Sequence, residues 1–206
     1  VQTCALPILF YLIIVLAFDD TFIFDMNTFI FSILYILIPI TTGTLNLNGF
    51  TLNTTGVVAC NGGSCTNGTF NSTATSLTFA GTTFGANITA NVTEVYFNGS
   101  TFNGSVTITK NGATNAQSNG NNVFNGATSI TNAGTGYLLL TNGGAGRVDT
   151  YNALTTLNTT NTGNLYLGYG RNVNFNANVV VNNTASTGST FLGNTGSVNL
   201  NTGITI

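Results

Sequence analysis

From about residue 77 onward the chain repeats one short pattern of apolar and polar positions. An aromatic residue or leucine starts each copy, asparagine usually follows, and two further β-prone positions lie four and six residues after the start. These starting residues, the anchors, are Phe84, Phe102, Phe124, Tyr151, Phe175 and Leu200. A separation of two residues puts both later positions on one face of a strand. Recurrence of a unit every roughly 20–50 residues is typical of stacked repeats.

A series of glycines keeps the same register as the anchors. Gly136, Gly163 and Gly188 are each followed at the third and fourth positions by apolar residues. These apolar pairs are Leu139/Leu140, Tyr166/Leu167 and Phe191/Leu192. One repeat therefore contains three short strands with Gly/Asn turns, and no stretch shows the helical stripe that βαβ crossovers need. The chain is predicted to be all-β, a parallel β-helix (β-solenoid) with coils of about 25 residues.

Stacked coils place equivalent side chains above one another, about 4.8 Å apart. The anchors should then stack inside the solenoid, with Ile108, Ile130, Leu157 and Val181 on an adjacent inner face. The asparagines should form a corner ladder in which each side-chain amide bonds to the next. The predicted ladder comprises Phe102, Asn103, Phe124, Asn125, Tyr151, Asn152, Phe175, Asn176, Leu200 and Asn201.

Residues 1–40 differ from the rest of the chain in composition. All 25 glycines lie at Gly43 or later, and no Lys or Arg precedes Lys110. Apolar runs of about ten residues are too short for a spanning helix, and a signal peptide would need a basic start. Residues 1–40 are therefore predicted to be a non-repeat hydrophobic segment that caps the coils or strays from them, without continuing their stacking.

The change of composition near residue 40 indicates where the regular repeats begin. Residues 1–8, VQTCALPI, resemble a translated sequencing-library adapter, which would make them an artefact. For residues 9–40, a native cap and a wrong reading frame both stay open. Residues 41–76 are predicted to form one or more irregular first coils. Residues 77–206 are predicted to form the β-helix repeats, and further coils are expected because the chain ends on GITI within a coil.

The composition limits the partners of the chain. Only 4% of residues are charged, the net charge is −2, and there is no histidine. Without a basic patch, a nucleic-acid partner is not expected, nor is a membrane partner for residues 41–206. Because 43% of residues are hydrophobic, an ordered fold is expected, with a surface of Asn, Thr, Ser and Gly.

The ionisable groups offer little for catalysis. In the repeats the carboxylates are Glu94 and Asp149, which the anchor spacing places on different coils, whereas a glycosidase pair lies about 5–9.5 Å apart. Zinc sites need clusters of His or Cys that the sequence lacks. No catalytic residue, metal ligand or cofactor is predicted, and the chain is not expected to be an enzyme. Cys60 and Cys65, in CNGGSC, either close a small disulfide or remain reduced.

The candidate ligand patch comprises Arg147, Asp149, Arg171, Tyr166 and Tyr169. Both arginines precede an anchor by four residues, so they should stack on adjacent coils with Asp149 along the same strand. The tyrosines lie on the strand that leads to Arg171. Such a cluster can hold a carboxylate or an acidic sugar; the alternative is one solvated salt bridge.

Outward positions five residues after each anchor form a partial array of hydroxyls. These positions are Thr89, Thr107, Ser129, Thr156, Val180 and Thr205. The pair Thr107/Thr109 is similar to the Thr-x-Thr rows of ice-binding solenoids, which makes ice binding a minor alternative function. The β-propensity of threonine and the need for solubility without charge explain the same array.

FNGSVTI and its copies resemble the Asn/Thr/Gly-rich β-helix regions of secreted bacterial surface proteins, broadly of the adhesin and filamentous-haemagglutinin type. The resemblance covers about Leu77 to Ile206 and is one of repeat style. It implies a non-catalytic structural or adhesive solenoid, extracellular or on the cell surface, that binds glycans or other surfaces by repeated weak contacts. The alternative is the β-helix part of a carbohydrate-active enzyme whose catalytic residues lie outside this sequence.

Overall fold

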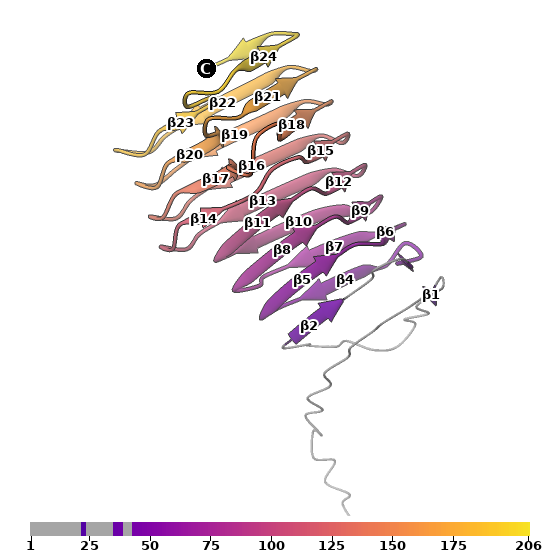
Figure 1. Ribbon diagram of the computed structural model, residues 1–206. Coiled ribbons are helices and arrows are strands. Elements are labelled where there is room, and N and C mark those ends of the chain that lie inside the picture. The colour runs from indigo at the N-terminus through magenta and orange to yellow at the C-terminus, as the bar shows by residue number, and fades with distance from the viewer. Residues whose placement is uncertain (1–21, 24–34, 39–42) are drawn as a thin grey trace, which may run out of the picture.

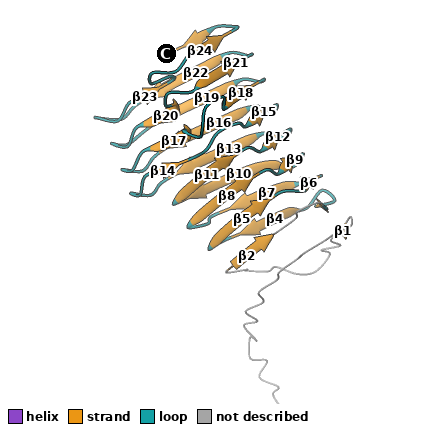
Figure 2. Ribbon diagram, in the orientation of Figure 1, coloured by secondary structure: helices purple, strands orange, loops and turns teal. Residues whose placement is uncertain are grey.

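The computed structural model describes residues 22–23, 35–38 and 43–206. Within these residues every regular element is a β-strand, and successive strands wind into coils that stack along one axis (Figure 1). Strands alternate with loops throughout the described part, as Figure 2 shows. The predicted all-β parallel solenoid is confirmed, because within each sheet the strands of successive coils pair in parallel.

Each coil contributes one strand to each of three faces. The anchor sheet comprises β1 (Phe22–Ile23), β3 (Thr44–Asn46), β6 (Ser64–Thr66), β9 (Thr83–Phe84), β12 (Thr101–Phe102), β15 (Val123–Phe124), β18 (Val148–Tyr151), β21 (Asn172–Phe175) and β24 (Val198–Leu200). The second sheet comprises β4 (Thr51–Thr54), β7 (Thr69–Ser72), β10 (Asn87–Val92), β13 (Val106–Lys110), β16 (Thr128–Asn132), β19 (Thr155–Thr159), β22 (Val179–Asn183) and β25 (Ile204–Thr205).

The third face is divided between two sheets. The lower sheet, in the earlier coils, comprises β2 (Tyr35–Ile38), β5 (Val57–Asn61), β8 (Ser76–Ala80) and β11 (Glu94–Asn98). The upper sheet, in the later coils, comprises β14 (Ala116–Gln117), β17 (Leu138–Thr141), β20 (Leu165–Gly168) and β23 (Thr190–Phe191). An isolated parallel bridge between Asn98 and Gly120 joins the end of the lower sheet to the first upper coil.

Coil length varies along the stack, and the longest coils lie in its later part. Equivalent residues are 18 apart for Asn53 and Asn71, 27 apart for Asn125 and Asn152, and 24 apart for Asn152 and Asn176. The additional residues lie in longer loops after β13, β16 and β19, which project from the stack near β14, β17 and β20 (Figure 1). The predicted length of about 25 residues therefore describes the later coils, and the earlier coils are shorter.

The coils begin earlier than the sequence indicates. Residues 44–80 form β3 to β8, which pair in register with the following coils, and their shorter spacing explains why no period was evident. Strands β1 and β2 pair in parallel with β3 and β5, so these residues continue the stacking, contrary to the expectation for residues 1–40. An apolar, β-prone run such as YILI pairs readily with an open strand edge. Residues 1–21, 24–34 and 39–42, including the adapter-like segment, lie outside the described residues.

The aromatic anchors form a continuous stack inside the solenoid. The rings of Phe102 and Phe124 lie 4.8 Å apart at 9°, and those of Phe124 and Tyr151 lie 4.7 Å apart at 2°. Phe84 and Phe175 extend the stack at its two ends, and all five rings are buried. Stacked aromatic pairs contribute about 0.5–1.5 kcal/mol each beyond the burial of their area.

The asparagines after the anchors form an exposed ladder along one corner. Each side-chain Nδ2 donates to the Oδ1 of the previous coil at 2.6–2.7 Å, through Asn103, Asn125, Asn152, Asn176 and Asn201. The last anchor, Leu200, pairs with Phe175 but is 40% exposed.

Candidate ligand-binding surface

The upper sheet carries apolar side chains on its outer surface. Leu138 and Leu140 of β17 point into the core, so Leu139 between them lies on the outer face of the strand, where neighbouring groups leave it only 4% exposed. Leu139 is in register with Tyr166 of β20, and Tyr166 is in register with Phe191 of β23. An outer column of apolar side chains therefore runs along the upper coils of a solenoid whose surface is otherwise mainly Asn, Thr, Ser and Gly.

Four rings make up what we call the outer aromatic patch: Tyr137, Tyr166, Tyr169 and Phe191. The rings of Tyr166 and Phe191 stack with centroids 4.7 Å apart at 8°. Tyr137 and Tyr169 meet Tyr166 edge to face, with centroids at 6.1 and 6.2 Å. Tyr169 is 51% exposed and the other three rings are partly exposed. The mutual contacts hold the rings in place while leaving part of the patch open to solvent.

Side-chain amides surround the outer aromatic patch. Asn164 donates to the Tyr166 hydroxyl at 2.9 Å, and Gln117 donates to the Tyr137 hydroxyl. Asn142 in turn donates to the Gln117 carbonyl oxygen at 3.1 Å. The patch thus combines ring faces and edges with neutral donors and acceptors, which is the chemistry that sugar hydroxyls and ring C–H groups meet in a binding site.

The side chains of Arg147 and Arg171 both contact Gly143, in the loop between β17 and β18. Arg171 donates from Nε to the Gly143 carbonyl at 2.5 Å and from Nη1 to the Gly170 carbonyl at 2.7 Å. The stem of Arg147 lies over the same glycine, because a Cβ built on Gly143 would be 2.3 Å from Arg147 Cδ. Both arginines are half-buried. Arg171 is therefore held by backbone carbonyls.

Asp149 is separated from the arginines and points into the core. Its side chain is fully buried, and Oδ1 accepts from the Asn122 backbone N–H at 2.8 Å and from Asn122 Nδ2 at 2.9 Å. The Thr141 hydroxyl donates to Oδ2. Burial raises the pKa of Asp149 from 3.8 to about 6, although these hydrogen bonds oppose the shift. Asp149 therefore belongs to the interior, and the patch expected from the sequence retains only its arginines and tyrosines on the outside.

Asp149 ends a ladder of buried polar side chains on the anchor sheet. The Thr82 backbone N–H donates to Ser100 Oγ at 3.2 Å, and the Ser100 N–H donates to Asn122 Oδ1 at 3.0 Å. The Asn122 N–H donates to Asp149 in the same manner. Each coil thus supplies an acceptor for a backbone N–H of the coil before it, so Asp149 has a structural role.

Glu94 and Asp149 do not form a pair of reacting carboxylates. Glu94 lies on the lower sheet and accepts a hydrogen bond from the Tyr96 hydroxyl at 2.8 Å, whereas Asp149 lies inside the anchor sheet of a later coil. The part of the chain that the structure describes contains no group of three His, Cys, Asp or Glu residues suited to a metal ion. No helix long and apolar enough to cross a membrane occurs in the described ranges.

The hydroxyl array lies on the outer surface of the second sheet. Thr89 and Thr107 are exposed and in register on β10 and β13. Further along the stack, Asn158 donates to Thr131 Oγ1 and Asn182 donates to Asn158 Oδ1, each at 3.0 Å. Asparagines thus interrupt the threonine rows, and their amides bond to neighbouring coils.

Cys60 and Cys65 lie in strands on either side of a tight corner. Cys60 is the penultimate residue of β5, and Cys65 is the central residue of β6. Both thiols are free and buried. Burial raises the pKa of Cys65 to about 12 and raises that of Cys60 as well, with a smaller contribution from Cys65. Both thiols therefore remain protonated near neutral pH.

Part of the outer aromatic patch was not foreseen from the sequence. Leu139, Tyr166 and Phe191 are recognisable as apolar residues after the glycine series, yet only their strand alternation shows that they face outward. Adjacent residues in a strand point to opposite sides, so one member of each apolar pair after the glycines had to lie outside. The surrounding amides of Gln117, Asn142 and Asn164 could not be assigned, because they come from different coils.

Comparison of the chain with protein-family models, with curated proteins and with solved structures finds no match. The fold and the surfaces described above are the basis for the function proposed below.

Proposed function

We propose that this chain is a non-catalytic structural and adhesive β-solenoid that acts outside the cell and binds neutral glycans by repeated weak contacts. The observation that carries the proposal is the outer aromatic patch on a surface of very low charge. Solvent-reaching aromatic rings supply flat apolar area, and the adjacent amides supply neutral hydrogen-bond partners. A sugar presents the complementary surfaces, with apolar C–H faces and a rim of hydroxyls.

The stacking of coils supports multivalent binding. Equivalent side chains recur at the strand spacing of about 4.8 Å along the upper sheet, and a polysaccharide also offers the same groups repeatedly. Several weak contacts on one rigid body act together because the second contact forms at high effective concentration. A structural role agrees with the same features, since Asn ladders and interior ring stacks make a rigid stalk.

The test is binding of a panel of neutral and acidic oligosaccharides to Tyr169→Ala, measured by calorimetry. Tyr169 is half exposed, so its loss should weaken binding of neutral sugars at least several-fold without unfolding the chain. The matched control is Tyr96→Ala, which removes a partly exposed tyrosine from the lower sheet. Equal affinity of Tyr169→Ala and Tyr96→Ala would contradict the proposal. A preference for acidic sugars would indicate Arg147 and Arg171 instead.

A further inference from the structure

The two cysteines occupy a pair of positions that face each other across a corner. Cys60 is in register with Phe79 of the next coil, and Cys65 with Phe84. The rings of Phe79 and Phe84 contact each other, with centroids 5.2 Å apart. One coil further, the equivalent rings of Phe97 and Phe102 are 5.9 Å apart. These two positions therefore direct their side chains into the same part of the interior in successive coils, and in the earliest of these coils both residues are cysteine.

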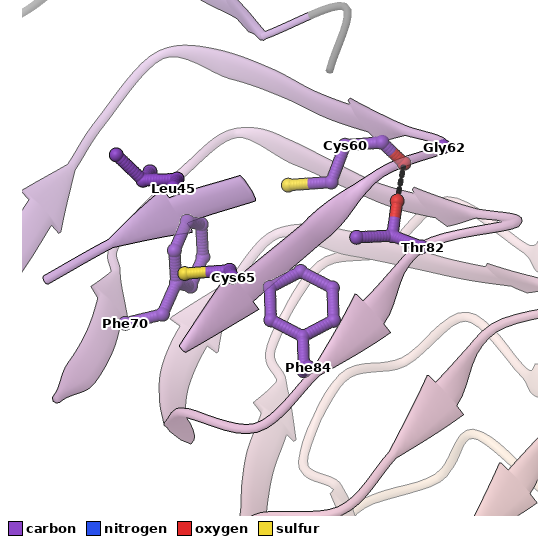
Figure 3. A pocket seen from close by; sticks show the side chains of 7 residues that line it. All are labelled: Leu45, Cys60, Gly62, Cys65, Phe70, Thr82 and Phe84. Carbon is purple, nitrogen blue, oxygen red and sulfur yellow. Dashed lines mark hydrogen bonds between the residues drawn. The ribbon is translucent and has the colours of Figure 1, made fainter. Parts of the chain in front are cut away.

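The small size of cysteine explains the cavity at this corner (Figure 3). Its lining consists of Leu45, Cys60, Gly62, Cys65, Phe70, Thr82 and Phe84. Thr82 is the polar side chain among these residues, and its hydroxyl already donates to the Cys60 carbonyl at 2.9 Å. The thiols therefore face an apolar space in which the lining offers no competing hydrogen-bond partner.

We propose that Cys60 and Cys65 form a disulfide that closes this corner when the protein meets a disulfide oxidant, such as oxidised glutathione or a thiol–disulfide oxidoreductase. The thiolate of one cysteine attacks a sulfur of the oxidant and releases one thiolate from it. The other cysteine then attacks the mixed disulfide and releases the second. The two cysteines lose two protons and two electrons in total, and the oxidant becomes two thiols.

Two features of the corner favour the approach that a disulfide requires. A disulfide needs Cβ atoms about 3.5–4.5 Å apart. The corner residues Gly62 and Gly63 have φ angles of 77° and 58°, a region that glycine adopts without strain. Neither glycine carries a side chain that would resist a small closure of the turn. The cavity between the strands leaves room for both sulfurs to rotate toward each other.

Burial controls when this reaction takes place. The thiols are protonated and buried in the folded protein, so oxidation requires transient local unfolding of this coil. Once formed, the disulfide is shielded by Leu45, Phe70 and Phe84 against reduction. The bond would fix one of the earliest described coils, close to the end of the described stack, where a solenoid is most prone to fraying.

The experiment uses the full chain with Cys4→Ser, so that only the corner cysteines remain. The protein is incubated with oxidised glutathione, both in buffer and during refolding from mild denaturant, and is then unfolded and treated with iodoacetamide. We expect a monomer without alkylation or glutathione, with a mass about 2 Da below the reduced protein, and a melting temperature that rises and falls again on reduction. Cys60→Ser in the same background should show one modified thiol and no redox shift in melting.

Two alkylated thiols after oxidative refolding would overturn the proposal, as would disulfide-linked dimers or a persistent glutathione adduct. The assay contains no glycan, so its outcome is independent of the adhesive function proposed above.

Discussion

Tyr151 shows how one polar atom is tolerated in the aromatic stack. Its ring lies between Phe124 and Phe175 at 4.7 and 4.9 Å. Its hydroxyl is buried and has no hydrogen-bond partner among the described residues. Burial and the nearby Asp149 raise the pKa of this hydroxyl. A buried donor without a partner costs about 1–3 kcal/mol, so the ring stabilises this position and the hydroxyl does not.

Tyr151→Phe should therefore stabilise the protein by about 1 kcal/mol, because the stack remains and the unpaired hydroxyl is removed. Urea denaturation of the variant and the parent chain measures the difference. Tyr166→Phe is the matched control, since its hydroxyl accepts from Asn164 and its removal should give no gain. Destabilisation by Tyr151→Phe would show that its hydroxyl has a bonding partner after all.

Asp149 makes stability depend on pH in a direction unusual for an acid. Its pKa rises from 3.8 in the unfolded chain to about 6 in the folded protein, so the folded state binds the proton more tightly. The stabilisation is complete below the unfolded value and is lost as the pH rises through the folded value. Linkage puts this loss at roughly 3 kcal/mol between about pH 4 and pH 7.

Asp149→Asn should remove this pH dependence. The amide oxygen can still accept from Asn122, and the amide nitrogen can donate to Thr141, so the interior bonds persist without a charge. We expect the variant to match the parent near pH 4 and to be more stable near pH 7. Denaturation midpoints at both pH values measure this. A variant less stable than the parent at neutral pH would show that the ionised carboxylate is the favoured form.

At the scale of the strand, the buried end of β15 and the exposed turn after it contribute differently to stability. Phe124 is buried in the stack, whereas Asn125 bonds to its neighbours on the exposed corner. Phe124→Ala should cost about 3–5 kcal/mol, because it leaves a cavity between two rings. Asn125→Ala should cost less than about 1 kcal/mol, since water can replace the lost partners. Guanidinium denaturation compares the two variants, and equal losses would contradict the division between core and corner.

The sequence was most informative where each coil repeats the one before it. Anchors such as Phe124 and ladder amides such as Asn125 recur in register, and identical positions necessarily lie above one another in a stack. Asp149 could not be placed in this way. Asp149 lies two residues before Tyr151 on the same strand, which indicates that both side chains point inward. Its charge nevertheless led to the prediction that it lies on the outer surface. The Asn122 and Thr141 partners that make burial tolerable come from other coils and strands.

At the scale of the molecule, coil length obscured the early coils. Their spacing of 18 residues, seen between Asn53 and Asn71, differs from the 24–27 of the later ones, so a single period misses them. The protruding loops that lengthen the later coils lie beside the upper sheet, which also carries the outer aromatic patch (Figure 1). The longer coils therefore coincide with the proposed binding surface.

The register of the second sheet permits a direct test of multivalent binding. Thr128, Thr155, Val179 and Ile204 occupy one equivalent position in successive coils. A second copy of residues 128–203 inserted after Gly203 should therefore continue the stack without a change of register and double the outer aromatic patch. Repeated contacts with a repetitive ligand should then raise affinity for a long neutral polysaccharide by roughly 10²-fold or more, but leave affinity for a short oligosaccharide nearly unchanged.

Because few charges take part, binding of the lengthened chain should be nearly indifferent to salt up to about 0.5 M, where exposed charges are strongly screened. Surface-based binding measurements on the parent and lengthened chains provide the comparison. Tyr169→Ala in both copies is the control and should remove most of the gain. Equal affinity of the two lengths for a long polysaccharide would contradict multivalent binding. Loss of binding at high salt would instead indicate that the polysaccharide binds through the charges of Arg147 and Arg171, which salt screens.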